Sequence, residues 1–245
     1  MCTASWLRLG DELRVFFNRD ELAGREPGDV PAATELEGVR FVAPRDGRAG
    51  GTWIAASDRG LALALLNRSD GVLPPSPGSR GRLIPRLMVA RDPDDLASRL
   101  LREPLRDLPP FSLASYWLEP ARAELAVWDG RYLATERLDP AGGMLCSSGL
   151  GDGRATAERA ARLAEARARS ERWEFDELRA FHRSHEPEPS AWSVCMHRSD
   201  AGTVSYTELS LSPAGVRLRY LGGAPCRGGE PTELALGTSP AIAAR

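Results

Sequence analysis

The chain has 245 residues and a mass of 26.6 kDa, and its 42% hydrophobic content is enough to bury the core of one large domain. Its formal net charge is -2 and its pI is about 6.0, so no basic surface is predicted that would attract nucleic acid or an anionic membrane. The longest apolar run, Leu61 to Leu66, is far shorter than the roughly 20 residues of a membrane span, and no signal-type segment opens the sequence, so we expect a cytoplasmic protein.

Strand-like segments dominate the first two-thirds of the chain, because β-branched, aromatic and apolar residues recur there between Gly, Asp and Pro. A Pro- and Gly-rich surface loop is expected at residues 73–81. A short helix is expected at residues 94–102, where aspartates near its start offer capping oxygens. The predicted strands cover residues 3–9, 13–18, 52–57, 61–67, 112–118, 123–128 and 131–136.

The clearest helical pattern spans residues 155–182, which are rich in Ala, Arg, Glu and Leu, and it allows a break near Ser170. We interpret the Arg- and Glu-rich face of residues 154–172 as a solvated helix surface. His182 and His185 follow at the C-terminal end of the pattern, where protonated imidazoles would complement the helix dipole.

Further strands are predicted at residues 192–196, 203–211 and 216–220. A Gly-, Pro- and Ala-rich tail follows, and we expect poor order over about residues 232–245. Strands, then helices, then strands again predict one α+β domain of layered sandwich type over residues 1–245, rather than the regular alternation of a Rossmann sheet.

The first two predicted strands form a hairpin with Gly10 and Asp11 as its turn, since glycine at the first central position tolerates the positive φ of a type II′ turn. Opposed residue numbers then sum to 21, which sets Cys2 opposite Arg19. A three-residue loop would instead oppose two arginines and is disfavoured. Directly opposed β carbons lie roughly 5 Å apart. The Cys2 thiol is therefore predicted beside a guanidinium.

A cysteine at this position could be a nucleophile. A nearby cation lowers the pKa of a thiol from its ordinary value of about 8.5. Removal of Met1 would leave Cys2 with a free α-amine, whose pKa of about 7.7–8.0 lets it act as a base. Nucleophile and base would then belong to one residue, with Asp20 orienting the amine and Arg19 supporting the thiolate. The alternative is that Cys2 is a small buried hydrophobe beside a solvated strand end.

The remaining cysteines indicate no further chemistry. No CxxC spacing, and hence neither a zinc site nor a disulfide framework, is found among Cys2, Cys146, Cys195 and Cys226. The run Cys195-Met196-His197 offers soft donors, but neighbouring residues on a strand point to opposite faces and cannot all reach one metal. We expect this run to pack in the core, and predict no metal and no cofactor.

Several motifs resemble those of the NRDE family, also called the transport and Golgi organisation family. Its members begin with Met-Cys-Thr and carry Asn-Arg-Asp-Glu, as residues 1–3 and 18–21 do here. The similarity is specific over about the first third of the chain and looser beyond it. The other matching motifs are Gly50-Gly51-Thr52-Trp53-Ile54, Gly60-Leu61, Leu65-Leu66-Asn67 and Ser79-Arg80-Gly81.

The resemblance implies an N-terminal nucleophile hydrolase fold, a four-layer αββα sandwich related to penicillin V acylases and bile salt hydrolases. In that family's chemistry Cys2 would attack an amide, with Arg19 and Asp20 as its supports and the N–H of Ser57 facing the oxyanion. The implied catalytic residues are Cys2, Arg19, Asp20, Ser57 and Ser147, and the implied binding residues are Asn18, Trp53 and Asn67.

Departures from the family pattern leave alternatives open. Ser57 and Ser147 stand where relatives commonly have asparagine, and Val204 where an arginine is frequent. Losing one oxyanion donor costs roughly 10²–10³ in rate. The leading hypothesis is hydrolysis of a non-peptide C–N bond in an amide of a small or acylated metabolite. The rival is non-enzymatic binding or trafficking of a hydrophobic small molecule such as haem or a lipid, and acyl transfer to an amine is a third option.

Overall fold

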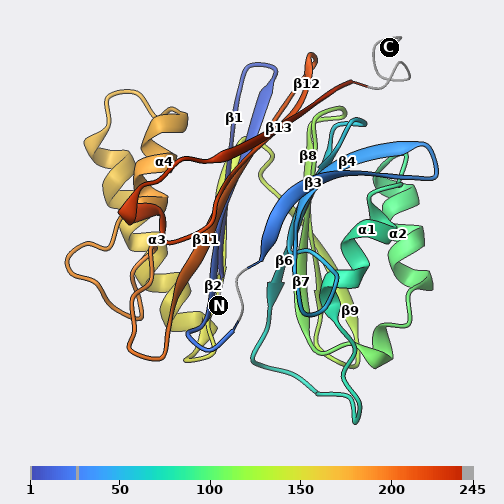
Figure 1. The fold of residues 1–245 in the computed structure, drawn as a ribbon, viewed down its shortest axis with the longest axis horizontal. Helices are drawn as coiled ribbons and strands as arrows, with labels where there is room; N and C mark the ends of the chain where they lie inside the picture. Colours follow the sequence, from blue (N-terminus) through green and yellow to red (C-terminus); the bar gives the residue numbers. More distant parts are fainter. Residues whose placement is uncertain (1, 26–27, 239–245) are drawn as a thin grey trace.

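The computed structural model describes residues 2–25 and 28–238 and has four layers (Figure 1). Two antiparallel sheets face each other, and a pair of helices covers the outer face of each sheet. This is the αββα sandwich that the sequence motifs implied, so the predicted fold class is confirmed.

The six-stranded sheet has the order β10-β1-β2-β11-β12-β13. Its strands are β1 (Cys2–Leu9), β2 (Glu12–Leu22), β10 (Gly142–Ser147), β11 (Ala201–Ser212), β12 (Gly215–Leu221) and β13 (Thr232–Gly237). Two helices, α3 (Asp152–Arg169) and α4 (Phe175–Arg183), cover its outer face, and the 3-10 turn η3 (Pro225–Arg227) precedes its last strand.

The seven-stranded sheet runs in chain order from β3 to β9. Its strands are β3 (Asp29–Leu36), β4 (Val39–Arg45), β5 (Ile54–Ser57), β6 (Leu61–Asn67), β7 (Phe111–Trp117), β8 (Arg122–Trp128) and β9 (Leu133–Leu138). Its outer face carries α1 (Leu83–Leu87) and α2 (Pro93–Arg102), with the short turns η1 (Arg80–Arg82) and η2 (Leu105–Asp107) beside them.

The main core lies between the two sheets, because the central strands are buried on both faces. In β2, Val15 and Phe17 point between the sheets, whereas Phe16 points toward α4. In β6, the alanines and Leu66 face the opposite sheet, while the other leucines pack against α1 and α2. Each large side chain buried in this way stabilises the fold by about 1.5–3 kcal/mol.

The predicted helix over residues 155–182 is two helices with a break after Arg169, close to the expected position. A capping box stabilises the N-terminus of α4, because the side chains of Glu174 and Glu177 accept from each other's backbone N–H groups. The break lets α3 and α4 lie on the same sheet face as separate rods.

Two expectations for the C-terminal part of the chain are wrong, one of a strand and one of a poorly ordered tail. Residues 192–196 form an irregular loop, since the Cys195 N–H donates to the Ser184 carbonyl at the end of α4 instead of to a strand. The expected tail contains β13, because Leu234 and Leu236 pack against the core between the sheets while the backbone pairs with β12. Residues 239–245 lie outside the described part of the chain.

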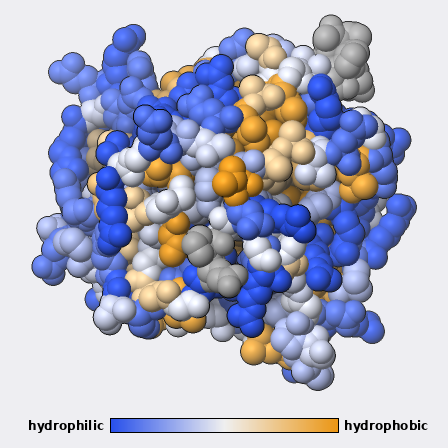
Figure 2. Space-filling view, in the orientation of Figure 1, coloured by the Kyte–Doolittle hydropathy of each residue, from blue (hydrophilic) through white to orange (hydrophobic). Residues whose placement is uncertain are grey.

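No helix among the described residues combines the length and the apolar composition that crossing a bilayer would require. The face of the molecule in Figure 2 is mostly hydrophilic, with a smaller apolar area toward its upper middle.

Candidate active site

Cys2 begins β1, a central strand of the six-stranded sheet, and it has a strand on either side. Across the first hairpin it pairs with Arg19, and the turn residue Gly10 has a φ of 59°, so the predicted register is confirmed. On its other side Cys2 pairs with Ser147 of β10. The sheet therefore fixes the thiol at one edge of the gap between the two sheets.

A cavity of about 380 Å³ opens beside Cys2. Strand β2 contributes Arg19 and Asp20 to its wall, and the end of β6 contributes Asn67. The loop before β5 contributes Trp53, so four of the residues that the motifs singled out lie around one space with the thiol.

Two glycine motifs build one wall of this cavity by direct backbone packing. The Thr52 N–H donates to the Gly81 carbonyl over 3.0 Å. A β carbon on Gly51 would lie only 2.4 Å from the Gly81 carbonyl carbon, which no real contact allows. This close approach presents Trp53 and Arg80 to the cavity from two segments distant in sequence.

Arg19 is held in place from several directions and is only 5% exposed. Its guanidinium stacks over the Trp53 ring, with Cζ 4.4 Å from the centroid. Its Nη2 lies 3.5 Å from Glu21 and 3.4 Å from Asp46. Its Nη1 is buried and has no hydrogen-bond partner among the described residues. A buried donor left over at a cavity wall is suited to bind an oxygen of a ligand.

The expectation of a lowered pKa for the Cys2 thiol is wrong, because other influences on this thiol outweigh Arg19. Burial of Cys2 raises the pKa of this thiol above its ordinary value, and the negative charge of Asp20 adds to the rise. The positive charge of Arg19 acts in the opposite direction but is the weaker influence. The thiol therefore needs a base to remove its proton.

Asp20 belongs to a buried network that reaches into the helix layer. It accepts a hydrogen bond of 2.6 Å from the Thr203 hydroxyl, and Arg159 Nη2 lies 3.3 Å from its carboxylate. Both charged side chains are fully buried, and Arg159 also donates to the Thr3 hydroxyl. This network holds the Asp20 carboxylate next to Cys2.

Arg159 was expected on a solvated helix face, and for this residue the expectation is wrong. The rest of that face fits, since Arg162 and Glu165 form an exposed pair. The signal that could have singled out Arg159 is its spacing, four residues after the buried Ala155 and four before Leu163, which packs on the core. Sequence analysis also assigned no role to Arg80, although its motif was noted.

A β-bulge in β11 shapes the same corner. Thr203 pairs with Asp20 and Ser205 pairs with Arg19, so Val204 is the extra residue. The bulge leaves the Thr203 hydroxyl free to donate to Asp20 and to accept from the Met196 N–H over 2.8 Å.

The predicted oxyanion serines do not line the cavity. Ser57 ends β5 opposite Phe41, and its buried hydroxyl has no partner among the described residues. Ser147 is next to Cys2 in the sheet, and its hydroxyl is likewise buried without a described partner. Asn67, which was expected to bind, is the one asparagine on the cavity wall within residues 2–25 and 28–238.

Asn18 points away from the cavity and joins β2 to the helix layer. Its amide nitrogen donates to the carbonyls of His182, over 2.8 Å, and Val194, over 2.9 Å. Its oxygen must then accept from His182 Nδ1 over 3.1 Å, while His182 Nε2 accepts from the Ser5 hydroxyl over 2.7 Å. The arrangement requires a neutral imidazole. Burial, with the charge of Arg159, lowers the pKa of His182 to about 3, so the expected protonated histidine is wrong.

This buried histidine predicts acid sensitivity. The pKa of His182 is about 3 when folded and about 6.5 when unfolded, so between these values the unfolded chain binds more protons. The free energy of unfolding should keep its full contribution from His182 above about pH 6.5. Between pH 6.5 and pH 3 it should fall by up to about 1.4 kcal/mol per pH unit. Urea unfolding at several pH values should show that the free energy of unfolding of His182→Gln falls less steeply as the pH is lowered. The exposed neighbouring change Arg183→Gln should keep the original slope, and equal slopes in all three proteins would contradict the assignment.

Comparison with known proteins agrees with this architecture. The family model for Transport and Golgi organisation 2 matches residues 1–189. A Caenorhabditis elegans N-acylethanolamine-hydrolyzing acid amidase ortholog has a similar structure, with a TM-score of 0.61 and 9% identity over 85% of this chain and 92% of that one. No curated protein sequence matches the chain.

Two variants of conjugated bile acid hydrolase from Clostridium perfringens are also similar, each with a TM-score of 0.51. Their identities are 11% and 10%, over 97% and 98% of this chain and 97% of each of theirs. Likeness at such low identity concerns the fold, and it agrees with the sandwich described above. The chain therefore has the fold of the N-terminal nucleophile hydrolases and belongs to the Transport and Golgi organisation 2 family.

Proposed function

We propose that the protein is an N-terminal nucleophile hydrolase that cleaves a non-peptide C–N bond, in an amide of a small or acylated metabolite. The observation that carries the proposal is the position of Cys2 in the wall of a cavity that Arg19 and Asn67 also line. The amide-hydrolysing relatives by fold support the reaction class.

The reaction proceeds through an acyl-enzyme. Once Met1 is removed, the α-amine of Cys2 accepts the thiol proton, which the raised pKa of the buried thiol otherwise retains. Sulfur bonds to the carbonyl carbon, the C–N bond breaks, and the amine leaves with the proton. Water then hydrolyses the thioester to the free acid and restores the thiol. Met1 itself lies outside the described residues.

Asn67 and Arg19 are the donors that we assign to the oxyanion. Both line the cavity, and Nη1 of Arg19 has no hydrogen-bond partner in the described part of the chain. Ser57, which the family resemblance suggested, is buried away from this space. The role therefore moves from a backbone donor at Ser57 to side chains at the cavity wall.

Asn67→Ala should lower kcat by roughly 10²–10³, as expected for the loss of one oxyanion donor. Its thermal midpoint should not change, because Asn67 is exposed. Ser57→Ala is the matched control and should leave kcat unchanged, since Ser57 does not reach the cavity. Steady-state kinetics on an amide that the enzyme turns over measures both. Equal rates for the two variants would remove Asn67 from the mechanism.

The cavity favours a polar substrate over a hydrophobic ligand. Haem or a lipid seated here would desolvate many charged groups without pairing them, which is costly. An amide with a carboxylate or another anionic group could instead pair with the guanidinium groups. The charged residues in the wall are Arg19, Asp20, Glu21, Arg25, Asp46, Arg48 and Arg80.

Intact mass spectrometry of the protein from its native host, before and after exposure to a panel of amides and activated acyl donors, tests the proposal. We expect a chain without Met1 that gains one acyl group and then loses it. Complete retention of Met1 would contradict the mechanism, because the base would be missing. Saturable binding without any acylated species would favour the binding-protein alternative.

A further inference from the structure

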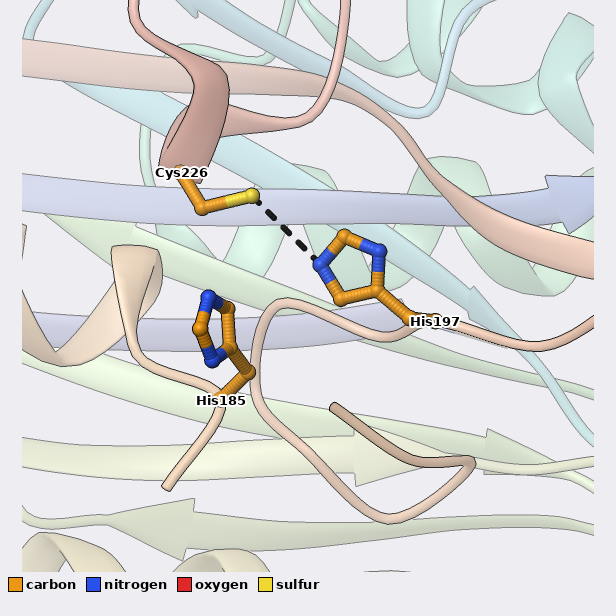
Figure 3. A group of neighbouring side chains, drawn as sticks. All are labelled: His185, His197 and Cys226. Atoms are coloured by element: carbon orange, nitrogen blue, oxygen red, sulfur yellow. Dashed lines mark hydrogen bonds between the residues drawn. The ribbon is translucent and has the colours of Figure 1, made fainter. Parts of the chain in front are cut away.

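A second group of reactive side chains lies on the helix-covered side of the six-stranded sheet, away from the cavity. Among the described residues, His185, His197 and Cys226 bring one nitrogen or sulfur atom each within 4.8 Å of one another. His185 follows α4, His197 ends the irregular loop and Cys226 lies in η3. Figure 3 shows the three side chains pointing toward one shared space.

Cys195 lies beside this group as a candidate fourth donor, although its Sγ is not among the atoms that all lie within 4.8 Å of one another, so its side chain would have to turn toward the ion. Its Sγ lies 3.7 Å from His197 Nε2, and Cys226 Sγ lies 3.4 Å from that same nitrogen. A tetrahedral zinc ion with bonds of about 2.0–2.3 Å separates its nitrogen and sulfur ligands by about 3.5 Å. These two separations lie close to this value before any ion is added.

We propose that His185, Cys195, His197 and Cys226 bind a Zn²⁺ ion as a His₂Cys₂ site. Imidazole and thiolate donors in tetrahedral arrangement select zinc over the hard cations, which prefer oxygen ligands. On binding, the two thiol protons pass to solvent, and the two thiolates balance the charge of the ion. Arg227 is exposed beside the site, where water screens its positive charge.

The surroundings leave the site ready for an ion. His185, His197 and Cys226 are each half-buried, so the ion can enter from solvent. The sequence excluded such a site because no CxxC motif occurs, but the fold assembles the donors from three segments.

Zinc bound at this site would also stabilise the position of Asp20, through hydrogen bonds from Met196 to Thr203 and from Thr203 to Asp20. Met196, between two of the ligands, accepts from the Thr203 N–H over 3.0 Å and donates to the Thr203 hydroxyl over 2.8 Å. That hydroxyl in turn donates to Asp20. Zinc would thus fix the loop that orients Thr203, whether or not the protein is a hydrolase.

The test uses the full chain, reduced and freed of metal by a chelator, then incubated with Zn²⁺ and separated from unbound ion. We expect one zinc per chain, a higher thermal midpoint with zinc, and thiolate-to-cobalt charge-transfer absorption when Co²⁺ is used instead. His197→Ala and Cys226→Ser should each weaken zinc binding by more than the roughly 10–100-fold that outer-shell changes cost. Cys146→Ser is the matched control, and it should keep full binding.

Three outcomes would overturn the site. They are no bound zinc in the reduced protein, zinc retained at full affinity by Cys226→Ser, and zinc lost equally in Cys146→Ser. His185→Ala changes a half-buried loop residue, so zinc binding by this variant provides a second test if one of the other variants folds poorly. A disulfide between Cys195 and Cys226 in the reduced and zinc-treated sample, seen by peptide mass mapping, would also reject the proposal.

Discussion

Cys2→Ala is expected to abolish amide turnover, with a fall in kcat of at least about 10³-fold, and to remove every acylated species from the mass spectrum. The reason is that, among the described residues that line the cavity, Cys2 is the one cysteine, so no other thiol there can take over the attack. The thermal midpoint should change little, because the side chain loses a single sulfur atom.

Cys146→Ala provides the control for this result. Cys146 lies in β10, is half-buried and does not line the cavity, so this variant should retain its rate and its acyl-enzyme. Activity that survives in Cys2→Ala would reject the nucleophile. A variant that loses turnover but still accumulates acyl groups elsewhere on the chain would reject it equally.

Arg159→Met is expected to lower the free energy of unfolding by about 3–5 kcal/mol, because it removes one side of the fully buried ion pair between Arg159 and Asp20. Urea unfolding followed by circular dichroism measures the change. Arg162→Met, on the same helix but in an exposed pair with Glu165, should cost less than about 1 kcal/mol.

The double variant Asp20→Asn with Arg159→Met separates charge from packing. It removes both charges, so it should recover part of the stability that Arg159→Met loses, while remaining inactive. Equal destabilisation by Arg159→Met and Arg162→Met would show that the buried pair contributes nothing. Failure of the double variant to recover stability would assign the loss to packing around the arginine stem instead.

The first hairpin shows that local sequence patterns can predict strand register. Gly10 supplies the positive φ of the turn, and alternation along β1 and β2 sets Cys2 opposite Arg19, so counting residues gave the register that the structure has. The strands β6, β7 and β8 were likewise predicted within one residue of their observed bounds. The strands β3, β4, β10 and β13 were missed. Strand β3 is mostly exposed and β10 begins with two glycines, so neither has a continuous apolar pattern.

The side chains that complete the candidate site were less accessible to sequence reasoning. In the sequence, Arg159 resembles the solvated arginines of α3. Only the tertiary fold brings it into contact with Thr3 of β1 and Asp20 of β2. The sequence indicated a nearby cation for Cys2, but the balance between Arg19 and burial depended on how deeply the sheet encloses the thiol.

The sequence by itself determined the layered α+β class, the family motifs and the pairing of Cys2 with Arg19, because turn chemistry and period-two alternation act between near neighbours in the chain. Only the tertiary structure decided the cavity, the buried Asp20–Arg159 pair and the grouping of His185 with Cys226. Those contacts join residues far apart in sequence, and their free energy comes from desolvation and packing, which arise only once the two sheets and their helices have come together.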